Sequence, residues 1–147
     1  MEKKVLLALK GLQFAMGDEG AQALETITPA EYYKKNDGHY VVYDEVTEGF
    51  NDITKNIIKF KDSHMEVTKR GLINVHMVFE ENKKNMTNYA TPFGNILIGI
   101  DTDEVEIEET EDRISVNVAY ALEANYEHMA DCKIEMNIRP RAEGLKL

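Results

Sequence analysis

The segment ISVNVAYALEANY, residues 114–126, alternates apolar and polar side chains along most of its length. Apolar side chains stand at even positions from Ile114 onward, and mostly polar ones stand at odd positions from Ser115 onward. A period of two is typical of a β-strand with one dry face and one wet face. Residues 130–138 repeat the pattern, and Pro140 ends it because proline has no backbone donor. Together the two segments predict an antiparallel sheet that is exposed on one side.

The same period predicts eight further strands. We expect them at residues 3–13, 22–35, 39–47, 54–61, 64–70, 75–81, 85–91 and 94–109. Polar turn residues separate them, and Asn36-Asp37-Gly38 supplies the left-handed conformations that a tight hairpin needs. No linker, repeat or low-complexity tract divides the chain, so residues 1–147 are predicted to form one domain.

The predicted fold class is all-β, a single antiparallel up-and-down β-barrel of about eight to ten strands. Closing the sheet on itself removes the two unpaired edges that an open sheet would expose. Several strands are long, which suits the tilted strands of a barrel better than the short strands of a two-sheet sandwich, the main alternative. Residues 28–34 leave two interpretations open. Thr28 followed by Pro29 is typical of a helix start, whereas a strand with a proline bulge fits the period better.

The segment 89–109 combines a turn with a change of phase. Thr91-Pro92-Phe93-Gly94 fits a type I turn, with proline at the first central position. Apolar side chains then stand at even positions through Ile100 but at odd positions from Val105. A continuous strand keeps one face buried across such a slip only by inserting a residue, so we predict a bulge within residues 101–104.

Charge and composition disfavour several classes of function. Lys plus Arg number 17 against 27 Asp plus Glu, a net charge of −10, which disfavours nucleic acid and anionic membrane surfaces as partners. The apolar run at residues 5–9 is too short to span a bilayer, and the chain shows no signal-peptide pattern. Cys132 is the single cysteine, so no internal disulfide can form, and a cytoplasmic location is expected.

Metal and cofactor chemistry finds little support in the sequence. An EF-hand loop needs glycine at its sixth position, where the acidic stretch 101–112 has Glu106. Strand geometry instead points Glu104, Glu106 and Glu108 into solvent. No phosphate loop, nucleophile elbow or dinucleotide motif occurs, so we expect no catalytic residue, no metal and no cofactor. The four histidines lack metal-binding spacing and are interpreted as surface or hydrogen-bonded core residues: His39, His64, His76 and His128.

Candidate ligand-binding residues come from strands whose side chains would line the barrel interior. Tyrosine offers a hydroxyl on an apolar ring, although core packing is the simpler interpretation. Arg70 would need a buried carboxylate or an anionic ligand if it pointed inward, and a strand-end arginine in water is the alternative. The other candidates are Tyr43, Tyr89, Tyr120, Val75, Met77 and Phe79.

The run GLINVHMVFEENKKNMTNYATPFGNILIGI, residues 71–100, resembles the YwiB-like family of bacterial proteins, and GHYVVYDE at residues 38–45 adds to the resemblance. In length and strand order the resemblance covers nearly the whole chain, although only the middle segment is distinctive. It implies a closed, lipocalin-like or calycin-like β-barrel. No reaction is established for the family, so the resemblance brings no catalytic residue, and ligand binding follows only by analogy of fold.

Three classes of function remain open. A barrel of this size can bind one small, partly apolar molecule in its interior without catalysing a reaction. A filled barrel can instead serve as an interaction module that pairs with a copy of itself or with another protein. A small enzyme is the least supported class, and its sign would be an inward carboxylic acid with a raised pKa.

Overall fold

The computed structural model describes residues 3–17, 20–46 and 49–141, with side chains described outside residues 12–24. Within these residues the chain forms ten β-strands, each close to a predicted one. Thr47, the predicted end of one strand, lies outside the described residues. The strands are β1 Lys4–Gly17, β2 Gly20–Lys35, β3 Gly38–Val46, β4 Ile53–Lys61, β5 His64–Arg70, β6 Val75–Glu80, β7 Lys83–Thr91, β8 Gly94–Glu109, β9 Ile114–Ala124 and β10 Glu127–Pro140.

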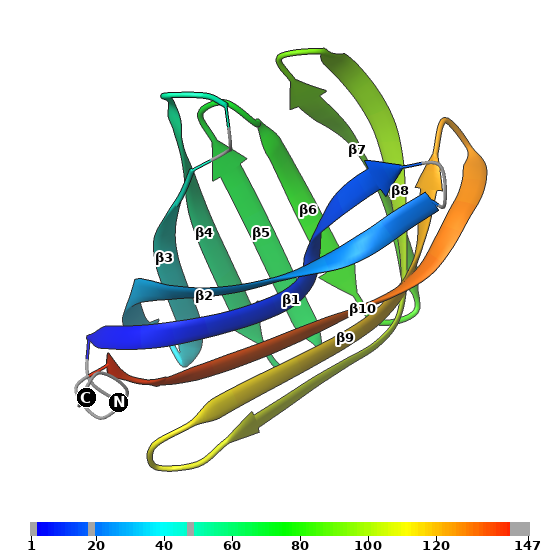
Figure 1. The fold of residues 1–147 in the computed structure, drawn as a ribbon. Helices are drawn as coiled ribbons and strands as arrows, with labels where there is room; N and C mark the ends of the chain where they lie inside the picture. Colours follow the sequence, from blue (N-terminus) through cyan, green and yellow to red (C-terminus); the bar gives the residue numbers. More distant parts are fainter. Residues whose placement is uncertain (1–2, 18–19, 47–48, 142–147) are drawn as a thin grey trace.

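The strands form one antiparallel sheet that curls until it nearly closes on itself (Figure 1). Nearly every strand pairs with its neighbours in the chain, and β1 also pairs with β10, so the first and last strands lie side by side. The ring is interrupted between β6 and β7, where Asn74 and Ala90 form an isolated bridge by exchanging two backbone hydrogen bonds of 3.0 Å. This order confirms the predicted all-β, up-and-down barrel and excludes the sandwich.

A bulge in β8 resolves the change of phase in its sequence. The register between β8 and β9 shifts between Thr102 and Glu104, within the predicted range. Ile100 before the bulge and Val105 after it are both buried, because the extra residue returns the apolar phase to the inner face. The strand thus stays continuous while it bends around the barrel.

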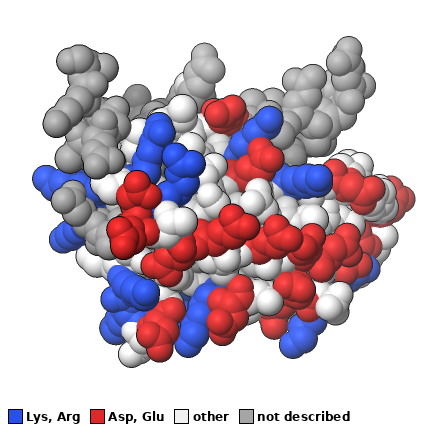
Figure 2. Space-filling view, turned by 90° about the horizontal axis from the view of Figure 1, so that it is seen from below, with Lys and Arg blue, Asp and Glu red and all other residues white. Residues whose placement is uncertain are grey.

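The outer face of β8 is acidic beyond this bulge. Glu104, Glu106 and Glu108 are exposed, as the alternation predicts. Acidic side chains form a band across the face of the barrel that is seen from below (Figure 2). A hydrogen bond to Glu106 and the charge of that side chain raise the pKa of Glu104. Such like-charge crowding disfavours the stacking of this face against another sheet.

Pro29 lies inside a strand, so the helical interpretation of residues 28–34 is wrong. The proline bulge is wrong as well, because Pro29 of β2 pairs in regular register with Leu6 of β1. The irregularity between these two strands falls farther along β1, between Lys10 and Gln13. Pro29 affects the pairing of β2 with β3 instead.

Pro29 stops the ladder between β2 and β3. The backbone N–H of Tyr32 donates to the Lys3 carbonyl at 2.7 Å, on the β1 side. Because backbone groups alternate in direction along a strand, the nitrogen of Pro29 faces β3. It has no proton to donate there, and the ladder ends at the pair of Glu31 and Val42. Beyond this pair the two strands separate and leave a fork in the barrel wall (Figure 1).

The centre of the barrel is filled with apolar side chains. Leu7, Ile58, Phe60 and Phe79 reach it from three strands, β1, β4 and β6, and each is 0% exposed. A water-sized space beside these side chains would leave part of their surface accessible, so the centre is closely packed. No helix in the described part of the chain is long and apolar enough to cross a membrane.

Candidate functional site

Three neighbouring strands place polar side chains on the inner face of the barrel. Tyr43 of β3 lies opposite Asn56 of β4, and Asn56 lies opposite Lys69 of β5. Glu45 and Thr54 form the next inward-facing pair, near the connection between β3 and β4. That connection lies at the upper end of the barrel in Figure 1. We call these five residues the inner polar cluster.

A buried ion pair holds the inner polar cluster together. Lys69 Nζ lies 2.9 Å from Glu45 Oε1 and 2.7 Å from Asn56 Oδ1. Asn56 Nδ2 donates to Glu45 Oε1 at 3.1 Å and to the Thr54 carbonyl at 3.3 Å. The side chains of Lys69 and Glu45 are 1% and 11% exposed, so both charges are largely removed from water. Burial lowers the pKa of Lys69, an effect that the charge of Glu45 opposes.

The hydroxyl of Tyr43 has no partner among the described residues. Tyr43 is 5% exposed, and its hydroxyl is buried without a hydrogen bond. Burial raises the pKa of Tyr43, and the charge of Glu45 raises it further, so the hydroxyl keeps its proton. Tyr89 of β7 is half-buried, and its pKa is raised by the same two causes. Tyr43 therefore offers an unused donor beside a carboxylate.

The inner polar cluster is costly to bury. The effective penalty for taking an ion out of water is several kcal/mol, and the attraction within a buried pair often only offsets it. A buried hydroxyl without a partner adds about 1–3 kcal/mol. Apolar side chains of similar size would avoid these penalties, as they do elsewhere in this barrel. A contribution to stability therefore does not explain why these polar side chains are buried.

A hollow at the fork between β2 and β3 lies next to the inner polar cluster. Its volume is about 360 Å³, and its lining includes Pro29, Val42 and Tyr43. Arg141 also lines it and donates from Nη2 to the Ala30 carbonyl at 2.8 Å. We call this hollow the notch. Tyr43 belongs to both the notch and the cluster, and it is the residue that joins them.

Arg70 does not lie in the interior. The side chains of Met65 and Val67 on β5 point into the core of the barrel. Alternation along the strand therefore places Lys69 inside and Arg70 outside. Arg70 is accordingly exposed. The inward-pointing cation is Lys69 instead, and Glu45 is the buried carboxylate that pairs with it.

The other candidate residues divide between the cluster and the packed core. Tyr43 lines the notch, and Tyr89 lies near the charge of Glu45. Tyr120 is 5% exposed and packs edge-to-face against Phe79, with ring centroids 5.1 Å apart. The remaining candidates belong to the hydrophobic core: Val75, Met77 and Phe79.

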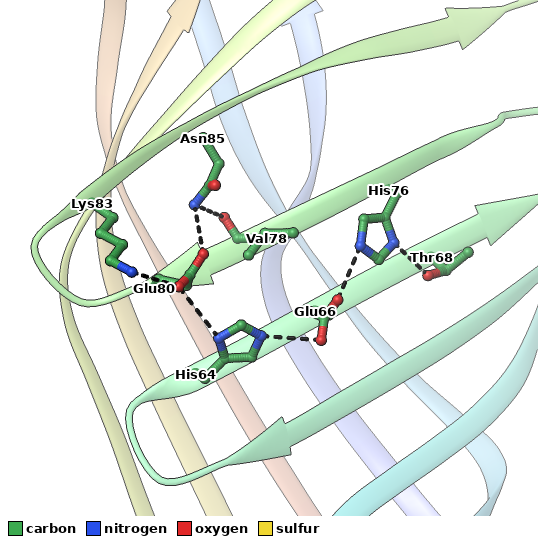
Figure 3. Close-up of polar contacts among 8 residues, drawn as sticks. All are labelled: His64, Glu66, Thr68, His76, Val78, Glu80, Lys83 and Asn85. Carbon is green, nitrogen blue, oxygen red and sulfur yellow. Dashed lines mark hydrogen bonds and ion pairs between the residues drawn. The ribbon is translucent and has the colours of Figure 1, made fainter.

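A second group of polar side chains lies on the outer face, beside the interrupted pairing of β6 and β7 (Figure 3). Glu66 accepts a hydrogen bond from His64 Nε2 at 3.0 Å, and its other oxygen lies 3.0 Å from His76 Nε2. Glu80 of β6 contacts Lys83 of β7 at 3.3 Å and accepts from Asn85 Nδ2 at 3.4 Å. These contacts join β6 to β7 where backbone pairing is missing.

The histidines of Figure 3 do not form a metal centre in this arrangement. Both imidazoles are engaged with one carboxylate rather than directed at a common point. No three His, Cys, Asp or Glu side chains among the residues that the structure describes could hold a metal ion. We therefore interpret the contacts of Glu66 with His76 as a link between β5 and β6, and those of Glu80 with Lys83 and Asn85 as a link between β6 and β7.

Apart from Tyr43, the residues of the inner polar cluster were not predicted from the sequence, although the sequence carries a signal for them. On β4 the residues in phase with the buried Ile58 and Phe60 include Thr54 and Asn56. Lys69 stands in phase with the buried residues of β5 in the same way. A polar residue that interrupts an apolar phase at the same end of adjacent hairpin strands marks a site. The signal is visible only when the inward-facing positions of each strand are compared one by one.

Comparison with known proteins identifies the family. A domain of unknown function, DUF1934, matches residues 8–136. The chain belongs to this family. A solved structure similar to this chain is that of the YwiB protein from Bacillus subtilis, with a TM-score of 0.76 and 18% sequence identity over 94% of this chain and 92% of that one. The YwiB-like resemblance is thereby confirmed, and at this identity the structural likeness shows the fold alone. No curated protein matches this chain.

Proposed function

We propose that this protein binds a small, partly apolar molecule whose polar group is held by the inner polar cluster. The observation that carries the proposal is the buried Tyr43 hydroxyl, which has no partner among the residues that the structure describes and lies near the charge of Glu45. An acceptor on the ligand would satisfy this donor and recover about 1–3 kcal/mol. Lys69 adds a further donor, because its ammonium has three and contacts Glu45 and Asn56 with two.

The proposed position is the notch and the cluster behind it, rather than the centre of the barrel. The centre is filled by side chains that are 0% exposed, which leaves no room beside Phe79. The notch, at about 360 Å³, falls within the range of small-molecule sites. Pro29 and Val42 would contact the apolar part of the ligand, and its polar group would reach Tyr43. We place this function in the cytoplasm, supported by the single, buried and free Cys132.

The test compares two tyrosines that lie on opposite faces of β3. Protein purified without denaturation is analysed by native mass spectrometry for a retained small molecule, and then by displacement of a fluorescent apolar dye with a series of fatty acids. Tyr43→Phe removes the inner hydroxyl and is expected to weaken binding about five- to 150-fold, the equivalent of about 1–3 kcal/mol. Tyr40→Phe removes an outer hydroxyl and is expected to leave binding unchanged.

Two results would contradict the proposal. One is a protein that carries no additional mass and releases no dye with any competitor. The other is equal binding by both tyrosine variants, which would place the dye away from the inner polar cluster.

Val42→Phe narrows the notch from the outer face and is expected to weaken binding while the inner polar cluster stays intact.

A second candidate function is protein interaction, favoured by apolar side chains near the upper end of the barrel. Phe93 is 87% exposed, Val46 72% and Ile53 53%. Phe50 and Phe93 lie edge to face with ring centroids 6.1 Å apart, which joins two connections at this end. Light scattering on the purified protein tests self-association. A monomer at all concentrations, with unchanged behaviour in Phe93→Ser, would remove the homo-oligomer from consideration.

A further inference from the structure

A second polar site lies at the other end of β3, away from the inner polar cluster. A hollow of about 330 Å³ is lined by Lys3, Tyr32, Tyr33, Lys34 and Glu109. Lys3 Nζ lies 5.2 Å from the centroid of the Tyr33 ring, so an ammonium stands over one wall of the hollow. Two lysines and one glutamate line the hollow, so its local charge is positive although the net charge of the chain is −10. This hollow is therefore a candidate for binding a small anion.

A buried histidine lies behind this hollow. His39 is 7% exposed, and its ring stacks on Phe60 with centroids 4.8 Å apart. The Tyr32 hydroxyl lies 2.6 Å from His39 Nδ1, and Glu109 Oε1 lies 3.6 Å from His39 Nε2. The second oxygen of Glu109 lies 3.6 Å from Lys34 Nζ. Tyrosine, histidine, carboxylate and ammonium thus form a continuous chain of contacts.

The protonation of His39 follows from its two neighbours. A neutral imidazole has one donor and one acceptor nitrogen, and the Glu109 carboxylate can only accept. Nε2 therefore carries the proton, and Nδ1 accepts from the Tyr32 hydroxyl. Burial lowers the pKa of His39, the charge of Glu109 raises it, and Lys34 lowers it. Near neutral pH the imidazole is uncharged, and the only proton of the Tyr32 hydroxyl is engaged inside the protein.

A second proton on His39 would reverse these roles. Nδ1–H would then donate to the Tyr32 oxygen, and the Tyr32 hydroxyl would be free to donate into the hollow. The imidazolium would attract the Glu109 carboxylate, which now lies between it and Lys34 at 3.6 Å from each. Lys34 would thereby lose its carboxylate partner. One proton taken up from solvent thus makes two donors available to an anion.

We propose that this hollow binds small molecules carrying a carboxylate, sulfate or phosphate group, and that binding is coupled to proton uptake by His39. Lys3 and Lys34 supply the charge, and Tyr32 supplies the directional hydrogen bond. The charged and titratable groups facing His39 are Tyr32 and Lys34 from β2 and Glu109 from β8, while β4 contributes the uncharged ring of Phe60. This site is separate from the inner polar cluster and does not depend on the proposed function.

The test uses sulfate, whose charge stays constant between pH 5.5 and pH 7.5. Sulfate is titrated into the whole chain in Bis-Tris chloride at constant ionic strength, and backbone and His39 ring resonances are followed by NMR. Because one proton is linked to binding, affinity is expected to rise at least about fivefold from pH 7.5 to pH 5.5. The His39 ring is expected to titrate at higher pH when sulfate is present.

Matched variants separate this site from general attraction to a charged surface. Lys34→Gln is expected to lower sulfate affinity at least about fivefold, whereas Lys35→Gln, the same change outside the hollow, leaves it unchanged. Glu109→Gln removes the carboxylate that competes with sulfate for Lys34 and pairs with the imidazolium. This variant is expected to bind more tightly at pH 7.5 and to show a smaller pH dependence.

Three outcomes would overturn the proposal. They are the absence of sulfate-induced shifts at Tyr32, Tyr33 and Lys34, equal losses in the two lysine variants, and the wild-type pH dependence in Glu109→Gln. Glu109 and Lys34 are 43% and 51% exposed, so their substitutions preserve the fold and the test stays decisive.

Discussion

The wall formed by β9 and β10 and the wall formed by β3, β4 and β5 follow the same alternation but bury different chemistry. On the inner face of β9 and β10, Ile114, Val116 and Ile134 are 0% exposed, among other apolar side chains. The inner face of β3, β4 and β5 begins at its lower end with apolar residues and His39, and changes to Glu45, Asn56 and Lys69 toward the other end. We call these the apolar wall and the polar wall.

The difference separates side chains whose burial stabilises the fold from side chains whose burial costs free energy. Burial of apolar side chains supplies most of the favourable free energy of folding. On the apolar wall this gain is not offset by the cost of burying charges. The polar wall must satisfy charges that gain little by being buried. Measured stabilities of variants on the two walls would show whether this division is real.

The largest effect is expected on the apolar wall. Ile134→Ala removes a fully buried side chain of the hydrophobic core, and the cavity left behind is expected to destabilise the fold by about 4 kcal/mol. Urea denaturation measures the change as a shift in midpoint. Glu135→Ala, the exposed neighbour, is the control and should stay within about 0.5 kcal/mol of wild type. Equal effects at the two positions would refute the assignment of the inner face.

The next largest effect is expected from breaking the ion pair of the polar wall. Lys69→Met leaves the Glu45 carboxylate without its cation and should destabilise the protein by about 3 kcal/mol. Arg70→Met, one residue along and exposed, should change stability little. If the pair serves binding rather than stability, adding Glu45→Leu to Lys69→Met should restore most of the loss. A double variant no more stable than Lys69→Met would show that the pair itself stabilises the barrel.

A small gain is expected when the unpartnered hydroxyl is removed. Tyr43→Phe keeps the ring and abolishes a buried donor without a hydrogen bond, so the free energy of unfolding should rise by about 1 kcal/mol. Calorimetry of the ligand-free protein measures this as a higher melting temperature. A lower melting temperature would mean that Tyr43 is hydrogen-bonded in solution. Gained stability together with weakened binding would mark Tyr43 as a residue kept for function.

The smallest expected effect is the change of protein stability with pH. His39, on the inner face of β3, has a pKa lowered by burial, so the unfolded chain binds a proton more readily than the folded one. Its contribution to stability is complete above the ordinary histidine pKa of about 6.5 and is lost as pH falls through the folded value. Urea midpoints from pH 7.5 down to pH 5 should therefore decline, and His39→Asn should reduce the decline. An unchanged slope in that variant would assign the loss to other groups.

Most of the fold could be predicted from sequence, because period two is a local property. The bulge after Ile100 could be predicted as well, since the phase of apolar residues shifts within a single strand. The fork depends on which neighbour the nitrogen of Pro29 faces, and that requires knowledge of the pairing on both sides of β2. The contacts of Glu109 with Lys34 and His39 join strands far apart in the sheet order, and no local pattern encodes them.

The candidate site was predicted in part. Tyr43 and Tyr89 were expected in the interior and lie there, whereas the buried cation is Lys69 rather than Arg70. Alternation from Met65 and Val67 was sufficient to place Lys69 inside. Sequence could not show that Tyr43 lacks a partner, because that depends on the distances between side chains of several strands.

The pairing of β1 with β10 has a consequence for how the chain reaches its final form. During synthesis β1 emerges first, with only β2 available to cover one of its sides. Its other side remains open until about a hundred further residues have been translated, which at about 5–20 residues per second takes several seconds or more. Barrel closure is therefore a late event that joins distant parts of the chain, and contacts of this kind slow folding.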